Sequence, residues 1–293
     1  GTTTLIHAPA STGGTAATLD KAAASTLKVP GGVPAKSTAA NRLTRVLLLG
    51  DSVAWTFGWN IGTNHIDTAK YGVEFFNQAI IGCGIMGDVP QHVEGKEDFG
   101  NQVCPHWQQI WTQDVQTYNP DVVAILVGRW ETTDRRINGR WTNVGQPDFD
   151  AFLAGQLDSA IADASSRGAK VALLTAPVYG TREGPNGAVY TETLPQRVAA
   201  FNEQLRAAAA RHPGVSVIDF GHVLTPGNVF RSKINGVPVR WDDGVHVLPA
   251  GTKAEVPVIM PQLARLRPTA AAAQAARGSG TNRPATAATA PIR

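Results

Sequence analysis

A serine near the start of the chain stands where it could act as a nucleophile. It ends the segment Val46-Leu-Leu-Leu-Gly-Asp-Ser52, directly after a continuous apolar run. A serine between a strand and a helix has its hydroxyl at the edge of the sheet, and its backbone N–H can donate to a developing oxyanion. The same position also suits a serine that caps a helix.

A carboxylate and an imidazole with complementary chemistry lie late in the chain. The segment Trp241-Asp-Asp-Gly-Val-His246 places Asp243 and His246 three residues apart. In a turn, this spacing lets the carboxylate reach Nδ1–H of the imidazole and leaves Nε2 free to take a proton from a serine. The alternative is a surface histidine beside two aspartates. We predict Ser52, His246 and Asp243 to be nucleophile, general base and orienting carboxylate.

Short apolar runs predict the strands that would position these residues. They are apolar on both faces, as buried parallel strands are, and fall at residues 45–49, 73–76, 121–127, 170–175 and 215–219. Helix-like segments alternate with them at residues 105–118, 149–167, 193–211 and 249–266. Alternating strands and helices predict βαβ units, and therefore an α/β fold of three layers with a central parallel five-stranded sheet. Sites in such sheets form beyond the carboxyl ends of the strands.

The two ends of the chain differ in composition from this middle part. Residues 1–40 and 268–293 are rich in Ala, Thr, Gly and Pro without apolar periodicity, so we expect a linker or stalk and a disordered tail around a catalytic domain at 41–267. The net charge of +3 comes with no clustered basic face, so we expect no nucleic-acid partner. No run is long and apolar enough to span a membrane, and no signal peptide is recognisable.

The chain has two cysteines, Cys83 and Cys104. We expect a disulfide between them, which would indicate an oxidising compartment; the alternative is two buried thiols. No second pair of ligands has zinc-site spacing, so we expect no metal and no cofactor.

Taken together, the first and last motifs resemble those of the SGNH (GDSL-like) hydrolase superfamily. Gly50-Asp-Ser52 and Asp243-x-x-His246 match the family's first and last sequence blocks, and the resemblance covers about residues 42–267. It implies a flavodoxin-like α/β/α sandwich with the catalytic roles given above. It also implies that Gly82, in the second block, adds its N–H to that of Ser52 in the oxyanion hole.

The third block departs from the family pattern. Where the family has Gly-x-Asn-Asp, this chain has Gly128-Arg-Trp-Glu131, so Trp130 replaces the asparagine. Either Trp130 Nε1 supplies the missing donor, or the hole uses only the N–H groups of Ser52 and Gly82. Arg129, Trp130 and Glu131 follow the third predicted strand and could contact substrate; a solvated charged loop is the alternative. Trp55 and Trp59 could stack on sugars or simply fill the core.

The third block, Gly82-Cys-Gly84 and the Ala/Thr/Pro-rich start resemble the extracytoplasmic SGNH domain fused to acyltransferase-3 membrane domains. This resemblance implies a cell-envelope protein tethered to a membrane acyltransferase part outside this chain. It would move an acyl group, usually acetyl, from an acyl donor through its serine to a glycan acceptor. A carbohydrate O-acetyl esterase and a catalytically silent glycan-binding module are the alternatives.

Overall fold

The computed structural model describes residues 32–39, 41–98 and 103–268. The chain divides into two units, Gly1–Pro34 and Ala35–Arg293, and the account below concerns the second. Most of the predicted linker and nearly all of the predicted tail lie outside the described residues. In the described part of the lead-in, residues 35–39 form no helix or strand, but Lys36 Nζ lies 2.6 Å from Asp121 Oδ1.

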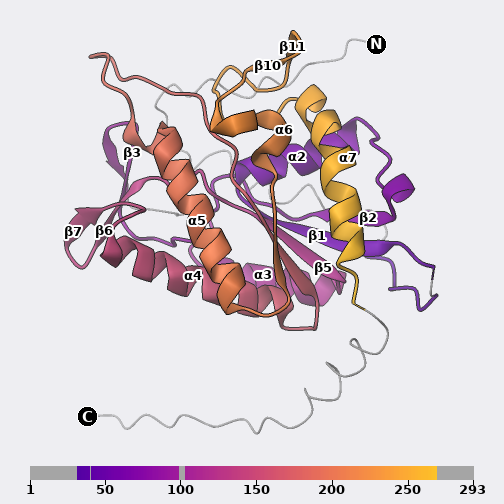
Figure 1. The fold of residues 1–293 in the computed structure, drawn as a ribbon. Coiled ribbons are helices and arrows are strands. Elements are labelled where there is room, and N and C mark those ends of the chain that lie inside the picture. Colours follow the sequence, from indigo (N-terminus) through magenta and orange to yellow (C-terminus); the bar gives the residue numbers. More distant parts are fainter. Residues whose placement is uncertain (1–31, 40, 99–102, 269–293) are drawn as a thin grey trace, which may run out of the picture. The chain divides into compact units, whose positions relative to one another are not determined.

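The predicted central sheet is confirmed. Its five parallel strands lie in the order β2-β1-β5-β8-β9 (Figure 1). Their bounds are β1 Thr44–Gly50, β2 Val73–Asn77, β5 Val122–Leu126, β8 Lys170–Leu174 and β9 Val215–Ile218. Strands β1 and β5 are buried along their whole length because helices cover both faces of the sheet, which explains why their sequences are continuously apolar.

The strand order fixes where a site can form. From β1 the chain moves outward to β2, and from β2 it crosses back over β1 to β5 and continues to β8 and β9. Because the crossovers are right-handed, this reversal places the helix between β1 and β2 on one face of the sheet and the three helices that precede β5, β8 and β9 on the other. The connections that leave β1 and β5 therefore diverge, and the carboxyl ends of these two strands are where ligands bind in open sheets of this kind. The predicted nucleophile follows β1 and the third sequence block follows β5.

The four helices predicted with bounds, α3, α4, α5 and α7, agree with the predicted positions to within about two residues. Helix α2 begins at the predicted nucleophile, and α7 packs against it. The helices are α2 Ser52–Thr63, α3 Trp107–Tyr118, α4 Pro147–Ser165, α5 Pro195–Arg211, the single turn α6 Gly221–Leu224 and α7 Pro249–Arg265. Three-residue 3₁₀ turns lie at η2 Ala69–Tyr71, η3 Thr191–Thr193 and η4 Pro226–Asn228.

Two smaller sheets are additions that the sequence did not predict. An antiparallel sheet of four strands has the order β4-β3-β6-β7, and a two-stranded hairpin precedes the Asp243 segment. The strands are β3 Gln91–Val93, β4 Lys96–Asp98, β6 Asp134–Ile137, β7 Arg140–Thr142, β10 Lys233–Ile234 and β11 Val237–Pro238. The four-stranded sheet joins the insertion after β2 to the insertion after β5.

Candidate active site

The turn that holds Ser52 is built for close packing. Gly50 has φ +146°, and a Cβ there would lie 1.9 Å from the carbonyl oxygen of Leu126, so only glycine fits. The next residue, Asp51, caps α2 by accepting a hydrogen bond from the Val53 N–H at 2.8 Å. Ser52 is therefore the first residue of the helix, at the carboxyl end of β1, and Asp51 braces the turn.

The predicted pairing of Asp243 with His246 is present. Nδ1 of His246 lies 2.6 Å from Asp243 Oδ2, while Oδ1 accepts the N–H groups of Val245 at 2.7 Å and His246 at 3.0 Å. Partial burial opposes ionisation of Asp243, but the hydrogen bond from His246 and these N–H groups hold its pKa below its usual value. The ionised carboxylate can fix the imidazole tautomer with Nε2 directed away from it.

Helix α2 is joined directly to the histidine segment. Asn60 Nδ2 donates to the Val247 carbonyl at 2.9 Å and to Thr252 Oγ1 at 3.0 Å, which ties the serine's helix to the residue after His246. No hydrogen bond between Ser52 and His246 is present within the described residues.

A buried arginine braces the other side of the histidine segment. Arg240 donates to the carbonyl of Val245 at 3.0 Å and to that of Val178 at 2.6 Å, and so links this segment to the loop after β8. The backbones of Gly180 and Gly244 touch in the same place, with a hydrogen bond of 2.8 Å. No local pattern indicates these roles of Asn60 and Arg240, because the bonds to Val247 and Val178 join residues that are far apart along the chain.

The second sequence block lies beside the serine turn. The Ile80 N–H donates to the Gly50 carbonyl at 2.9 Å, which places the following residues at the carboxyl end of β1. Gly82 has φ +81°, a left-handed conformation that favours glycine. The predicted disulfide is confirmed next to it: Cys83 and Cys104 are joined, both fully buried, with their Cα atoms 5.5 Å apart. The bridge anchors the segment that carries the Gly82 N–H.

The third block packs tightly against the second. A Cβ on Gly84 would lie 2.7 Å from both Trp130 Cβ and Glu131 Oε1, so the two blocks are in direct contact. The Ile85 N–H donates to Glu131 Oε1 at 2.8 Å. Nε1 of Trp130 is buried and has no hydrogen-bond partner among the described residues. A donor role of Trp130 Nε1 in an oxyanion hole stays a prediction.

The charged residues of the third block are not a solvated loop. Glu131 is completely buried and Arg129 is 6% exposed, with its guanidinium 5.9 Å from the ring centroids of both Trp130 and Tyr179. Burial raises the pKa of Glu131 to about 7, and the nearby Asp51 carboxylate adds to the rise. Burial likewise raises the pKa of Asp51 to about 6, partly opposed by hydrogen bonds and by His246. Substrate contact by Arg129, Trp130 and Glu131 stays a prediction, and burial favours a positioning role for Glu131.

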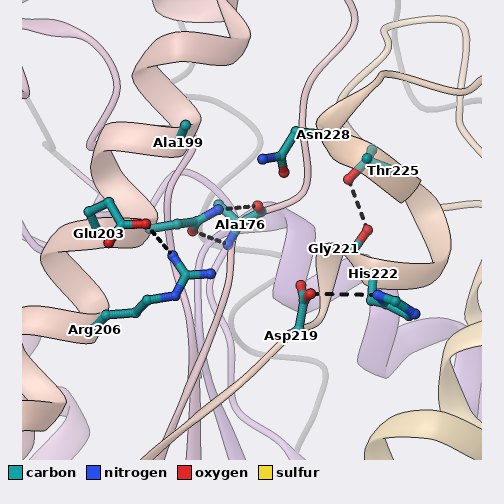
Figure 2. A pocket seen from close by; sticks show the side chains of 11 residues that line it. Ala176, Ala199, Glu203, Arg206, Asp219, Gly221, His222, Thr225 and Asn228 are labelled. Carbon is teal, nitrogen blue, oxygen red and sulfur yellow. Dashed lines mark hydrogen bonds and ion pairs between the residues drawn. The ribbon is translucent and has the colours of Figure 1, made fainter.

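A polar cavity of about 260 Å³ lies elsewhere, between α5 and the turn after β9 (Figure 2). Two ion pairs border it: Glu203 with Arg206 at 2.9 Å, and Asp219 with His222 at 3.7 Å. The side chain of Asn202 forms hydrogen bonds with both backbone groups of Ala176 there. None of Ser52, Asp243 and His246 lines this cavity, so it is not the place where the predicted triad would act.

Other kinds of site can be examined over residues 32–39, 41–98 and 103–268. Within these ranges no group of three or more His, Cys, Asp or Glu side chains is placed to hold a metal ion. None of the helices there combines the length and apolar character needed to cross a bilayer.

The fold and this geometry define an α/β domain of the hydrolase type, with a serine at the switch point of the sheet and a His–Asp pair on a neighbouring loop. The chain belongs to the family described as "SGNH domain (fused to AT3 domains)", whose model matches residues 25–261. A search of curated proteins finds no match.

Solved structures share the fold at low sequence identity. A GDSL-like lipase from Bacteroides thetaiotaomicron is 16% identical with a TM-score of 0.50, over 78% of this chain and 92% of that chain. A carbohydrate acetylesterase family member from Sinorhizobium meliloti is 14% identical with a TM-score of 0.46, over 76% and 99%. An acetylxylan esterase from Geobacillus stearothermophilus, in a catalytic mutant, is 13% identical with a TM-score of 0.44, over 76% and 95%. At 16% identity and a TM-score of 0.50, the likeness to the lipase shows the fold alone.

Proposed function

We propose that this chain transfers an acyl group to a hydroxyl of a cell-surface glycan through an acyl-enzyme on Ser52. The observation that carries the proposal is the 2.6 Å bond between His246 and Asp243, on a segment that Asn60 ties to the helix beginning at Ser52. A base oriented by an ionised carboxylate, held beside a serine at a helix start, is the arrangement that activates a serine hydroxyl.

The reaction then has two symmetrical halves. Ser52 Oγ attacks the carbonyl carbon of the acyl donor while His246 Nε2 takes the hydroxyl proton, and the leaving group departs with that proton. In the second half, a glycan hydroxyl gives its proton to His246 and attacks the acyl-enzyme, and Ser52 regains a proton as the ester leaves. Asp243 stays ionised throughout and stabilises the imidazolium.

The negative charge on the carbonyl oxygen would be met by N–H groups from three segments. These are the backbone N–H groups of Ser52 and Gly82 and the indole Nε1–H of Trp130, which has no partner within the described residues. Removing one such donor costs about 10²- to 10³-fold in rate where it has been tested. Glu131 supports this hole indirectly, because it binds the Ile85 N–H and contacts the Gly84 backbone position.

The family suggests where the reaction takes place. Membership of the family of SGNH domains fused to AT3 domains supports a membrane acyltransferase part that supplies the acyl group and tethers this chain. The buried Cys83–Cys104 disulfide supports an oxidising, extracytoplasmic compartment. We therefore propose a cell-envelope location, a glycan acceptor and an acyl donor supplied at the membrane.

Replacing the nucleophile tests the proposal. With p-nitrophenyl acetate as donor, Ser52 should gain one acetyl group detectable by mass spectrometry, and a soluble oligosaccharide should accelerate its loss while becoming acetylated. Ser52→Ala should abolish both signals, and Ser37→Ala, in the lead-in segment, is the matched control. Turnover to acetate with no sugar ester would mean that the protein is an esterase. Failure to acetylate Ser52 at all would leave a glycan-binding module without catalysis.

A further inference from the structure

An aromatic stripe runs along α2 from the buried Ser52 to the exposed Trp59. Ser52, Trp55 and Trp59 are spaced so that they lie within roughly 60° of one another around the helix axis. Side chains on a helix lean toward its N-terminus, so both indoles lean toward Ser52. The opposite face of the helix is the buried one and includes Val53, Phe57 and Ile61.

The two indoles form a rigid platform. Their rings are stacked with centroids 5.0 Å apart and an angle of 13° between the planes. Trp59 is nevertheless 43% exposed, because Trp55 covers only one of its faces. Helix positions four apart hold such pairs in register. The free face of Trp59 is thus a flat apolar surface of fixed orientation on the helix that presents Ser52.

The chemistry around this platform narrows the choice of ligand. Helix α2 contains no charged residue. The hydroxyls of Thr56 and Thr63 lie on the same stripe and donate to backbone carbonyls, so their oxygens can still accept from a ligand. A membrane-binding helix face usually presents Lys or Arg, and this face has none. An uncharged aromatic surface edged by hydroxyl acceptors suits a neutral sugar ring, which has an apolar C–H face and a rim of hydroxyls.

We propose that the Trp55–Trp59 platform is a subsite for a neutral glycan chain; this inference rests on the proposed function of Ser52. Trp59 is seven positions after Ser52, which corresponds to about 10 Å along the helix axis. That span is longer than a single sugar ring. A ring stacked on Trp59 is therefore a neighbour of the ring whose hydroxyl reaches the acyl-enzyme. The acceptor is an oligomer or polymer, and a monosaccharide cannot use both places.

Binding can be measured independently of catalysis. The full chain is titrated by calorimetry with xylotetraose, cellotetraose and chitotetraose, and with the matching monosaccharides. At least one tetrasaccharide should bind, and Trp59→Ala should weaken that binding by about 3- to 10-fold. Trp59→Phe should restore most of it. Trp141→Ala is the matched control, because Trp141 is 37% exposed and also stacked, on His92, but lies in the small antiparallel sheet.

Two results would overturn the subsite. One is that no tetrasaccharide binds, or that all bind Trp59→Ala as well as the wild-type chain. The other is that vesicles containing phosphatidylglycerol bind the chain through Trp59 while the sugars do not.

Acetyl transfer separates this inference from the proposed function. The rate constant for transfer to a tetrasaccharide, divided by that for the monosaccharide, should be well above one in the wild-type chain and in Trp141→Ala, and should fall toward one in Trp59→Ala. If Trp59→Ala transfers acetyl with the same ratio as the wild-type chain, the platform is not a subsite, but the proposed acyltransferase function stands. Loss of Ser52 acetylation in the wild-type chain would remove the proposed function, while the binding titration would still decide the platform.

Discussion

Two carboxylates of the candidate site have opposite environments. Asp243 is partly exposed and accepts three hydrogen bonds, so its pKa is held below the usual value. Glu131 is completely buried, has one oxygen without a partner in the described residues, and has its pKa raised by burial to about 7. The first is kept charged and the second close to neutral. The difference fits the proposed roles, in which Asp243 orients the histidine and Glu131 would hold the backbone that carries the proposed oxyanion hole.

Of the two carboxylates, Asp243 should have the larger effect on the reaction rate when its charge is removed. Asp243→Asn keeps the shape of the side chain but removes the charge that selects the imidazole tautomer, so kcat for acetyl transfer should fall by about 10³- to 10⁴-fold. Steady-state kinetics with p-nitrophenyl acetate measures this. Asp242→Asn, at the exposed neighbouring position, is the control and should keep the wild-type rate. A decrease of less than tenfold in Asp243→Asn would show that His246 does not depend on Asp243.

Neutralising the buried Glu131 should affect the free energy of unfolding more than the reaction rate. The folded chain keeps the Glu131 proton up to about pH 7, whereas an unfolded chain releases it near the usual pKa of 4.5. The folded state therefore binds more protons in this window, and the free energy of unfolding falls as pH rises from 4.5 to 7, by about 1.4 kcal/mol per pH unit for this group.

Glu131→Gln removes that loss, because glutamine stays neutral and can still accept the Ile85 N–H. Denaturant unfolding at pH 5, 6, 7 and 8 should show the variant gaining stability over the wild-type chain up to about pH 7 and no further. Its kcat should stay within about tenfold of the wild-type value, since catalysis would need the position of Glu131 and not its charge. A pH-independent stability difference would contradict the raised pKa.

The same contrast explains what could be predicted from sequence. The central strands were predictable because parallel strands buried on both faces have continuous apolar sequences. The Asp243–His246 pair was predictable because three-residue spacing brings both groups together within one turn. Burial of Glu131 and Arg129 was not, because charged residues are rarely buried and their surroundings come from distant segments. The small antiparallel sheet was not predicted for a related reason: its strands are short, and two of them, Lys96–Asp98 and Asp134–Ile137, consist mostly of charged residues.

Another buried carboxylate, outside the candidate site, gives the sharpest control for the comparison. Glu255 in α7 is fully buried, its Oε1 accepts the Leu224 N–H at 3.2 Å, and Oε2 has no partner among the described residues. Burial raises its pKa to about 8, well above the usual 4.5. Like Glu131, it binds a proton in the folded state that the unfolded chain has lost, so it too lowers stability as pH rises, up to about pH 8.

Glu255→Gln should therefore gain stability over the wild-type chain by about 1.4 kcal/mol per pH unit, with the gain ending near pH 8 rather than pH 7. It should change kcat and the rate of Ser52 acetylation less than Glu131→Gln does, because Glu255 binds the N–H of Leu224 in α6 and is linked to the histidine segment only through its charge interaction with Arg240. Unfolding curves and acetylation rates from the same samples decide this. If Glu255→Gln slowed acetylation as much as Glu131→Gln, replacing any buried carboxylate near the sheet would disturb the site. The effect of Glu131→Gln could then not be assigned to the contact of Glu131 with the Ile85 N–H.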